Sequence, residues 1–216
     1  MATTTPPPRE TLADLLQRLG NIPPSRVRLR PAPGTATEAD LLRILDRENI
    51  TCELVDGVLV EKTMGYQESE IAFLIGTLLN NYILPRRLGI VLGPDGTLRM
   101  ISGQVCAPDV TFIPFDHLPG GKRPREPIPD LAPDLAVEVL SKGNTKGEMA
   151  RKLREYFESG TRLVWMVDPK SKTVRVYHGP TPKPSAVLTE DQTLDGGDVL
   201  PGFSVLVRDL FPVDEI

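Results

Sequence analysis

Glu138 and Asp109 are the two residues whose surroundings in the sequence best suit chemistry. Glu138 interrupts the apolar run 135–140, which predicts a strand buried on both faces. A buried carboxylate needs a partner, because an isolated charge is costly to remove from water. Asp109 precedes a second apolar stretch, residues 110–113. Carboxylates on adjacent strands can converge on one Mg²⁺ ion, which activates water and neutralises charge on a phosphodiester.

Each carboxylate also has a purely structural interpretation. Glu138 could lie at the end of its strand and reach solvent or an arginine. Asp109 follows Pro108, and Pro-Asp pairs are common in turns. The two residues together are stronger evidence for a site than either alone, because neighbouring strands joined by a loop would bring both side chains to one place.

The elements that position these residues follow from hydrophobic periodicity and turn signals. We expect helices over residues 10–19, from Thr37 onward, over 68–84 with Pro85 ending the helix, and over 145–159. Hairpins are expected over residues 52–61, turning at Asp56-Gly57, and over 89–101, and strands over 104–113, 135–140, 163–167, 173–177 and 201–205. This order predicts an α/β domain built on one mixed central sheet flanked by helices.

A chain of 216 residues is long enough for one domain with a substantial core and short for two. The Pro-rich residues 1–34 are expected to form a flexible leader around a short amphipathic helix, and residues 35–216 the single domain. Cys52 and Cys106 lie in no metal-binding or disulfide pattern, which favours reduced thiols and a cytoplasmic protein. The N-terminus has no signal-peptide pattern, and no apolar run is long enough to span a membrane.

The net charge of −4 is mildly unfavourable for binding nucleic acid, which usually needs a basic surface. Three short basic runs are candidate phosphate contacts: Arg86-Arg87, residues 122–125, and Arg151 with Arg154. A solvated surface is the commoner role of such runs. Charge therefore neither establishes nor excludes a nucleic-acid partner.

The two carboxylates belong to a wider pattern. Pro108-Asp109, a spacer and then residues 137–141 resemble the Uma-type putative restriction endonuclease family, within the PD-(D/E)XK nuclease superfamily. The resemblance covers roughly residues 35–212, and its other parts are residues 53–57, Pro133-Asp134-Leu135, Lys152, Tyr156, Gly160, residues 164–169 and Pro201-Gly202-Phe203. It implies a restriction-endonuclease-like core and hydrolysis of phosphodiester bonds in DNA that depends on Mg²⁺, with Mn²⁺ able to substitute.

One position departs from the superfamily pattern, which places a lysine two residues after the glutamate, where this chain has Leu140. Residues two apart on a strand share a face, so the expected lysine position is apolar. The resemblance makes Lys152, on the following helix, the first candidate to supply the positive charge that the lysine of the superfamily pattern would supply. Lys142 is the second candidate, if the strand runs that far. The alternative for Lys152 is an exposed helical pair with Glu148, worth a few tenths of a kcal/mol.

Glu53, in the first hairpin, is a candidate third acidic member of the site by the same resemblance. Its alternative is an exposed hairpin residue. The family often has a histidine at the start of the helix expected near residue 68, where this chain has Gln67 and Glu68, either of which could take over the polar role.

Three functions fit these observations. The first is a DNA endonuclease with Mg²⁺ held by Asp109 and Glu138, Glu53 assisting through water and Lys152 positioning the nucleophile. The second is a non-catalytic nuclease-fold module that binds nucleic acid or a protein partner, favoured by the missing lysine and the acidic net charge. The third is a metal-dependent phosphoesterase acting on a small nucleotide. A homodimer would suit the cutting of both strands of a duplex.

Overall fold

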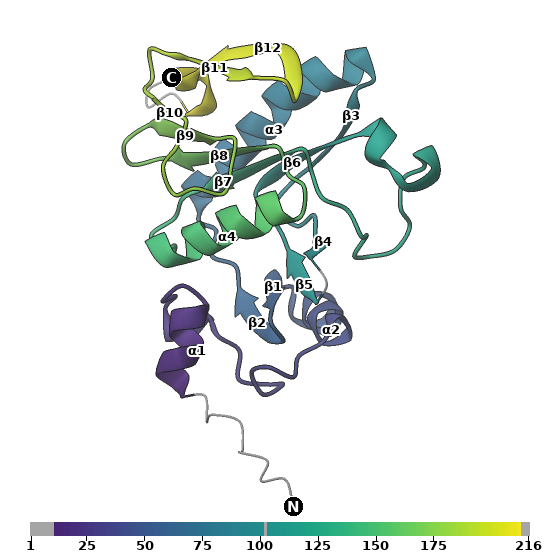
Figure 1. The fold of residues 1–216 in the computed structure, drawn as a ribbon, viewed down its shortest axis with the longest axis vertical. Helices are drawn as coiled ribbons and strands as arrows, with labels where there is room; N and C mark the ends of the chain where they lie inside the picture. Colours follow the sequence, from purple (N-terminus) through teal and green to yellow (C-terminus); the bar gives the residue numbers. More distant parts are fainter. Residues whose placement is uncertain (1–10, 102, 213–216) are drawn as a thin grey trace, which may run out of the picture.

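The computed structural model describes residues 11–101 and 103–212 (Figure 1). The α-helices in this part of the chain are α1 (Leu12–Arg18), α2 (Glu38–Glu48), α3 (Tyr66–Arg86) and α4 (Lys146–Glu158). The strands are β1 (Cys52–Val55), β2 (Val58–Glu61), β3 (Gly89–Leu92), β4 (Leu98–Ile101), β5 (Gln104–Cys106), β6 (Val110–Pro114), β7 (Leu135–Val139), β8 (Leu163–Asp168), β9 (Thr173–Tyr177), β10 (Ala186–Leu188), β11 (Thr193–Gly196) and β12 (Leu200–Leu206).

The central sheet has six strands in the order β10-β9-β8-β7-β6-β3. Strands β7 and β8 are parallel and are joined through α4, while the other neighbours are antiparallel. Apolar residues of α3 pack on one face of this sheet and those of α4 on the other. The expectation of a mixed central sheet flanked by helices is therefore confirmed.

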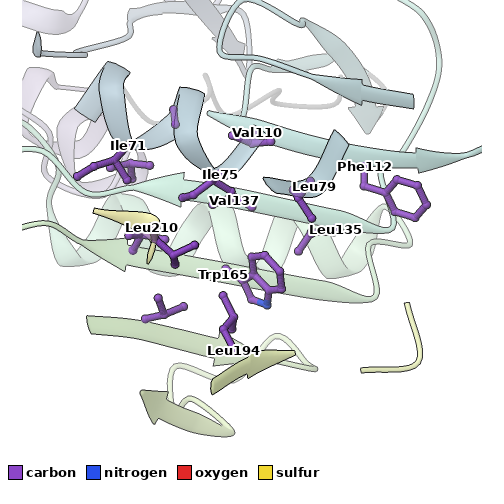
Figure 2. Packing of buried hydrophobic residues seen from close by; sticks show 14 of the residues in the cluster. Ile71, Ile75, Leu79, Val110, Phe112, Leu135, Val137, Trp165, Leu194 and Leu210 are labelled. Carbon is purple, nitrogen blue, oxygen red and sulfur yellow. The ribbon is translucent and has the colours of Figure 1, made fainter. Parts of the chain in front are cut away.

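The larger core lies between α3 and the central sheet (Figure 2). Ile71, Ile75 and Leu79 follow one another at helical spacing on α3 and face Val110 and Val137 of the sheet. Burying each such side chain contributes about 1.5 to 3 kcal/mol relative to exposure. Because α3 covers one face of the sheet, the polar side chains of β6 and β7 lie on the other face, which α4 covers.

Strand β7 is buried along its whole length, as its apolar sequence predicts. Leu135, Val137 and Val139 belong to the core against α3, whereas Ala136 belongs to the core against α4. Because side chains alternate along a strand, Glu138 also points toward α4. The only acidic residue of the strand therefore lies beneath a helix.

A second sheet of four strands, in the order β2-β1-β5-β4, lies beside the central sheet. Figure 1 shows it in the lower half of the molecule, together with α1 and α2. The β1–β2 turn has positive φ at Asp56 and Gly57, as a two-residue hairpin turn requires, so the predicted 52–61 hairpin is confirmed. Strands β11 and β12 form a separate two-stranded sheet, so residues 11–101 and 103–212 form three sheets rather than the single sheet expected.

The prediction of one strand over residues 104–113 is wrong. The chain leaves β5 in the four-stranded sheet, passes through Ala107, Pro108 and Asp109, and enters β6 in the central sheet. Pro108 has no backbone N–H to offer a strand neighbour, which suits a break at this point. The break places Asp109 at the junction of the two sheets.

The predicted 89–101 hairpin is also wrong. Strand β3 pairs with β6, and β4 pairs with β5, so the two segments belong to different sheets. Gly93 and Gly96 do close a turn between them, but a turn signal does not determine which strands pair after it. Pro85 does not end α3 either, because the helix runs to Arg86 and ends at Arg87 in the left-handed conformation.

Residues 12–34 lie against the β1–β2 hairpin. Leu15, Leu19 and Ile22 pack with Val55 and Val58 in one buried cluster. The start predicted for the first helix, Glu10, lies outside the described residues, and the division of the chain at residue 34 stays a prediction. Within the part of the chain that the structure describes, no helix is long and apolar enough to cross a membrane.

Candidate active site

Asp109 and Glu138 lie side by side at the junction of the two sheets. The Asp109 backbone N–H donates to the Val137 carbonyl at 3.0 Å, and the Val139 N–H donates to Asp109 Oδ2 at 2.7 Å. The first bond extends the β6–β7 pairing, in which Val110 stands opposite Val137, and the second is accepted by the Asp109 side chain. The backbone of β7 therefore holds the carboxylate of Asp109 in place beside Glu138.

Lys152 reaches inward from α4 to two carboxylates. Its Nζ lies 2.9 Å and 3.1 Å from the two carboxylate oxygens of Glu138 and 2.8 Å from Glu53 Oε1. The Lys152 side chain is 3% exposed. The alternative of an exposed helical pair with Glu148 is wrong, because Lys152 bridges two buried acids from different sheets.

Glu53 is buried rather than exposed on the hairpin. Its carboxylate accepts a hydrogen bond from the Ala107 N–H at 3.3 Å as well as the contact from Lys152. The residue is 2% exposed. Strand β1 thus brings a third carboxylate from the four-stranded sheet to the ammonium group that holds Glu138.

Lys62 is a member of the cluster that the sequence analysis did not find. Its Nζ lies 2.7 Å from Asp109 Oδ1 and also donates to the backbone carbonyls of Pro94 and Ala107. The hairpin register offers a signal for it. Glu53 stands opposite Val60, so both face the same side of the hairpin, and Lys62 lies two residues beyond Val60.

Nearby positive charge and burial act on the pKa of Glu53 and of Glu138 in opposite directions. For Glu138, burial raises the pKa above its usual value, aided by Asp109 and Glu53 and opposed by Lys152. For Glu53, burial also acts to raise the pKa, but attraction to Lys152, Arg151 and Lys62 outweighs it and the pKa lies below its usual value. Two neighbouring carboxylates with pKa values shifted in opposite directions are a common mark of a functional site.

The two partners of Glu138 on α4, Lys152 and Tyr156, both have pKa values well above their usual values. For Lys152, burial lowers the pKa, but Glu138, Glu53 and Glu148 together raise it well above its usual value, so the group stays charged. The Tyr156 hydroxyl donates to Glu138, and burial raises the pKa of this phenol well above its usual value. Tyr156 therefore acts as a neutral hydrogen-bond donor.

Two further buried ion pairs involve α4, and the first of them joins the helix to another segment. Arg26 makes a two-fold contact with Glu148, at 2.9 Å and 2.7 Å, and also donates to the carbonyls of Glu61 and Gly143. Arg151 pairs with Glu155 at 2.7 Å, so this arginine is not a surface phosphate contact. The contacts of Arg26 tie the helix that carries Lys152 to the N-terminal segment and the first hairpin, whereas the Arg151–Glu155 pair lies within α4.

Several predicted site residues lie elsewhere. Strand β7 ends at Val139, so Lys142 does not continue it and is an exposed loop residue. Gln67, Glu68, Leu140 and Lys142 line a neighbouring cavity rather than the carboxylate cluster. Lys152 is thus the candidate lysine that meets the acids.

The donor chemistry of the cluster fits a hard divalent cation. Asp109, Glu138 and Glu53 offer only oxygen donors. Among the described residues, no group of three or more His, Cys, Asp or Glu side chains is arranged to hold one metal ion. The carboxylate oxygens of Asp109 and Glu138 suit a site of two carboxylates, which is common for Mg²⁺ when water and phosphate oxygens complete its coordination.

A mixed sheet with helices on both faces, and an acid–lysine cluster beneath α4 where the two sheets meet, describe an α/β protein with a restriction-endonuclease-like core. Residues 38–210 match the family Uma2, described as putative restriction endonuclease, and the chain belongs to this family. No curated protein is significantly similar to the chain in sequence.

The fold is shared with a solved structure, described as a putative nuclease belonging to DUF820 from Anabaena variabilis ATCC 29413. The two chains are 21% identical with a TM-score of 0.67, and the match covers 81% of this chain and 97% of the other. A likeness at this level of identity shows a common fold.

Proposed function

We propose that the chain is a metal-dependent endonuclease that hydrolyses phosphodiester bonds in DNA. The observation that carries the proposal is the buried cluster in which Lys152 joins Glu138 to Glu53 while Asp109 lies alongside. A bound Mg²⁺ or Mn²⁺ would be held by Asp109 and Glu138, and it would polarise a phosphate oxygen and lower the pKa of a bound water. Family membership supports the same reaction class.

The other side chains supply positioning and charge. The Lys152 ammonium is charged and fixed by two acids, so it can orient the attacking water or stabilise the negative charge of the transition state. Lys62 supplies a second positive charge beside Asp109. Glu53 orients Lys152 and can hold a water through its carboxylate, while Tyr156 fixes the carboxylate of Glu138 by donating to it.

Cleavage of supercoiled plasmid and of labelled oligonucleotides with Mg²⁺, Mn²⁺ or EDTA tests the proposal. Each of Asp109→Asn, Glu138→Gln and Lys152→Met should reduce the cleavage rate by roughly a hundredfold or more, the scale on which loss of one charge-stabilising group acts. Glu158→Gln is the matched control, since Glu158 is an exposed acid on the same helix. Cleavage that persists in EDTA, or in Glu138→Gln, would refute the proposal.

One observation favours the non-catalytic alternative, a nuclease-fold module that binds nucleic acid or a protein partner. The side chains of Glu53, Asp109, Glu138 and Lys152 are each no more than 4% exposed, and each has an ionic partner, since Lys152 pairs with both glutamates and Asp109 pairs with Lys62. Such a network could serve only to hold the two sheets and α4 together. Titration of the protein with Mg²⁺ by calorimetry separates the two functions, because a purely structural network has no reason to bind the ion.

The expected DNA partner and a two-fold homodimer remain predictions. A homodimer would present two copies of the cluster, which would suit the cutting of both strands of a duplex. Sedimentation of the full chain, alone and with DNA, measures the oligomeric state directly.

A further inference from the structure

A cavity of about 870 Å³ lies between α4 and the ends of β7, β8 and β9. The apolar part of its lining includes Leu140, Met149, Leu153, Met166 and Tyr177, together with two prolines of the loop before β10. The volume falls within the range of about 300 to 1,000 Å³ that is usual for ligand pockets.

The cavity adjoins the carboxylate cluster through three residues of its wall. Leu140 lies two residues beyond Glu138, and Met166 stands directly opposite Glu138 in the β7–β8 register. Leu153 follows Lys152 on α4. A ligand in the cavity would therefore lie next to the groups proposed to hydrolyse the phosphodiester.

The rim of the cavity carries an excess of positive charge. Lys142, Lys146 and Lys170 are exposed, and within the described ranges none lies within 4 Å of a carboxylate oxygen. The positive charge of Arg175 is offset by Asp168, whose Oδ2 lies 3.6 Å from a guanidinium nitrogen of Arg175. Glu68 is the other acid in the lining, so the three lysines outnumber the acid that opposes them.

An apolar wall under a cationic rim matches a ligand with a flat apolar part and attached phosphates. A nucleotide has both parts, since its base can stack on apolar and aromatic side chains while its phosphates meet lysines. A base within a duplex cannot enter a pocket unless it is unpaired and turned out of the stack. Single-stranded DNA offers its bases without that cost.

We propose that this cavity binds an unpaired nucleotide next to the scissile phosphodiester, so that the chain acts on single-stranded or locally unpaired DNA. The inference rests on the proposed function for its choice of DNA. It adds the strandedness of the substrate and assigns the lysines to the phosphates beside the site of cleavage.

Fluorescence anisotropy in EDTA tests the binding without any cleavage. A labelled single strand of about ten nucleotides should bind more tightly than the duplex of the same sequence by about tenfold, because the duplex must first unpair a base. An abasic strand of equal length should bind about fivefold more weakly or worse, since it lacks the base that stacks. Duplex and single strand binding equally, or no effect of removing the bases, would overturn the proposal.

The double variant Lys146→Glu/Lys170→Glu tests the rim. It should weaken binding of the single strand by about tenfold, and the slope of log affinity against log salt should fall by about 0.7 for each lost phosphate contact. The matched control is Lys122→Glu/Arg125→Glu, the same charge reversal in the exposed basic run of another loop. Equal losses in both variants, or a loss only in the control, would place the strand elsewhere.

The variant Ala150→Trp tests the interior of the cavity without changing its charge. Ala150 lines the cavity from α4, so a tryptophan there would fill the space and weaken binding of the single strand while the thermal unfolding midpoint stays near that of the parent protein. Unchanged binding would show that the strand does not use the cavity. A mononucleotide competing as strongly as the oligonucleotide would instead identify a free nucleotide as the ligand.

The binding and cleavage results can fail separately. Tight single-strand binding that depends on the rim, with no cleavage in Mg²⁺ or Mn²⁺, would refute the proposed function and leave the cavity as a nucleic-acid site. Metal-dependent cleavage that is equal on duplex and single strand, and unaffected by Ala150→Trp, would uphold the function and refute the cavity proposal.

Discussion

Lys152 is the buried ammonium group that pairs with two carboxylates, Glu53 and Glu138, both of which are almost fully buried. Replacing it with methionine keeps most of the side-chain volume but leaves Glu53 and Glu138 without this partner. We expect Lys152→Met to destabilise the fold by about 3 to 5 kcal/mol, the usual cost of a buried charge that loses its partner. Urea unfolding at neutral pH measures the loss.

Two comparisons make the Lys152 prediction specific. Lys122→Met, an exposed lysine, should change stability by no more than about 0.5 kcal/mol. The triple variant Lys152→Met/Glu53→Gln/Glu138→Gln should recover part of the loss, because it removes the buried charges together with their partner. A loss below about 1 kcal/mol in the single variant would mean that solvent screens the cluster, as at surface ion pairs.

The opposite pKa shifts of Glu53 and Glu138 predict opposite effects on stability as pH changes. Glu53 has a folded pKa below its usual 4.5, so its contribution is present above pH 4.5 and is lost as pH falls through the folded pKa. Glu138 has a folded pKa above 4.5, so its contribution is full below pH 4.5 and is lost as pH rises through the folded pKa.

Glutamine variants isolate the two contributions. Glu53→Gln should flatten the loss of stability on the acid side of pH 4.5, and Glu138→Gln should flatten the loss above it. The free energy of unfolding measured in urea across this range gives both slopes, with Glu158→Gln as the exposed control. Parallel curves for all three variants would contradict the assignment of the shifts.

At the residue scale, the sequence reveals a site member when its context is locally unusual. Glu138 stands out because it is charged within an apolar strand, and Asp109 because it follows a proline at the start of another. Lys62 has no such context, and its role depends on a loop from a distant part of the chain. Only the register of the hairpin, with Glu53 opposite Val60, connects it to the site.

At the element scale, α4 depends on a close backbone contact at its first turn. A Cβ on Gly147 would lie 2.5 Å from the Gly20 carbonyl oxygen, so the two backbones touch where Thr145 also donates to that oxygen. We expect Gly147→Ala to destabilise the protein by about 1 to 3 kcal/mol through overpacking, despite the higher helix propensity of alanine. Chemical denaturation of the purified variant measures the effect.

Gly76 provides the matched control for this prediction, since it is also helical. A Cβ there would meet only Val110, at an ordinary 4.0 Å. Gly76→Ala should therefore stabilise the protein by about 0.5 to 1 kcal/mol through its gain in helix propensity. If both alanine variants are stabilised, the N-terminal segment does not press against α4 in solution.

Element types were more predictable than element partners. The helix over residues 146–158, the Asp56-Gly57 hairpin and the buried strand β7 follow from local signals, namely apolar spacing, turn residues and a continuous apolar run. The prediction of one strand over residues 104–113 is wrong because the two halves of this segment, β5 and β6, belong to different sheets. Strand pairing depends on contacts far apart in the sequence, which no local pattern records.

At the scale of the whole molecule, the net charge is acidic although one part of the surface carries an excess of positive charge. The chain carries −4 overall, yet three lysines that have no carboxylate partner among the described residues line one cavity beside the buried acids. Net charge averages over such patches, so it could not have located the rim. The family resemblance identified the fold, but the arrangement of two sheets around the cluster required the structure.

A divalent cation that binds only the folded protein must stabilise the whole molecule, whatever its catalytic role. At about one hundred times the dissociation constant, Mg²⁺ should add about 2.7 kcal/mol, which for a chain of this size raises the unfolding midpoint by roughly 5 to 10 °C. Differential scanning calorimetry with Mg²⁺, compared with Na⁺ at matched ionic strength, measures the shift. Glu158→Gln should retain the shift, and Asp109→Asn should lose it because it removes a charged ligand. An equal rise of the unfolding midpoint in both variants would mean that the ion binds elsewhere on the surface. Asp109 and Glu138 would then be structural partners of Lys62 and Lys152.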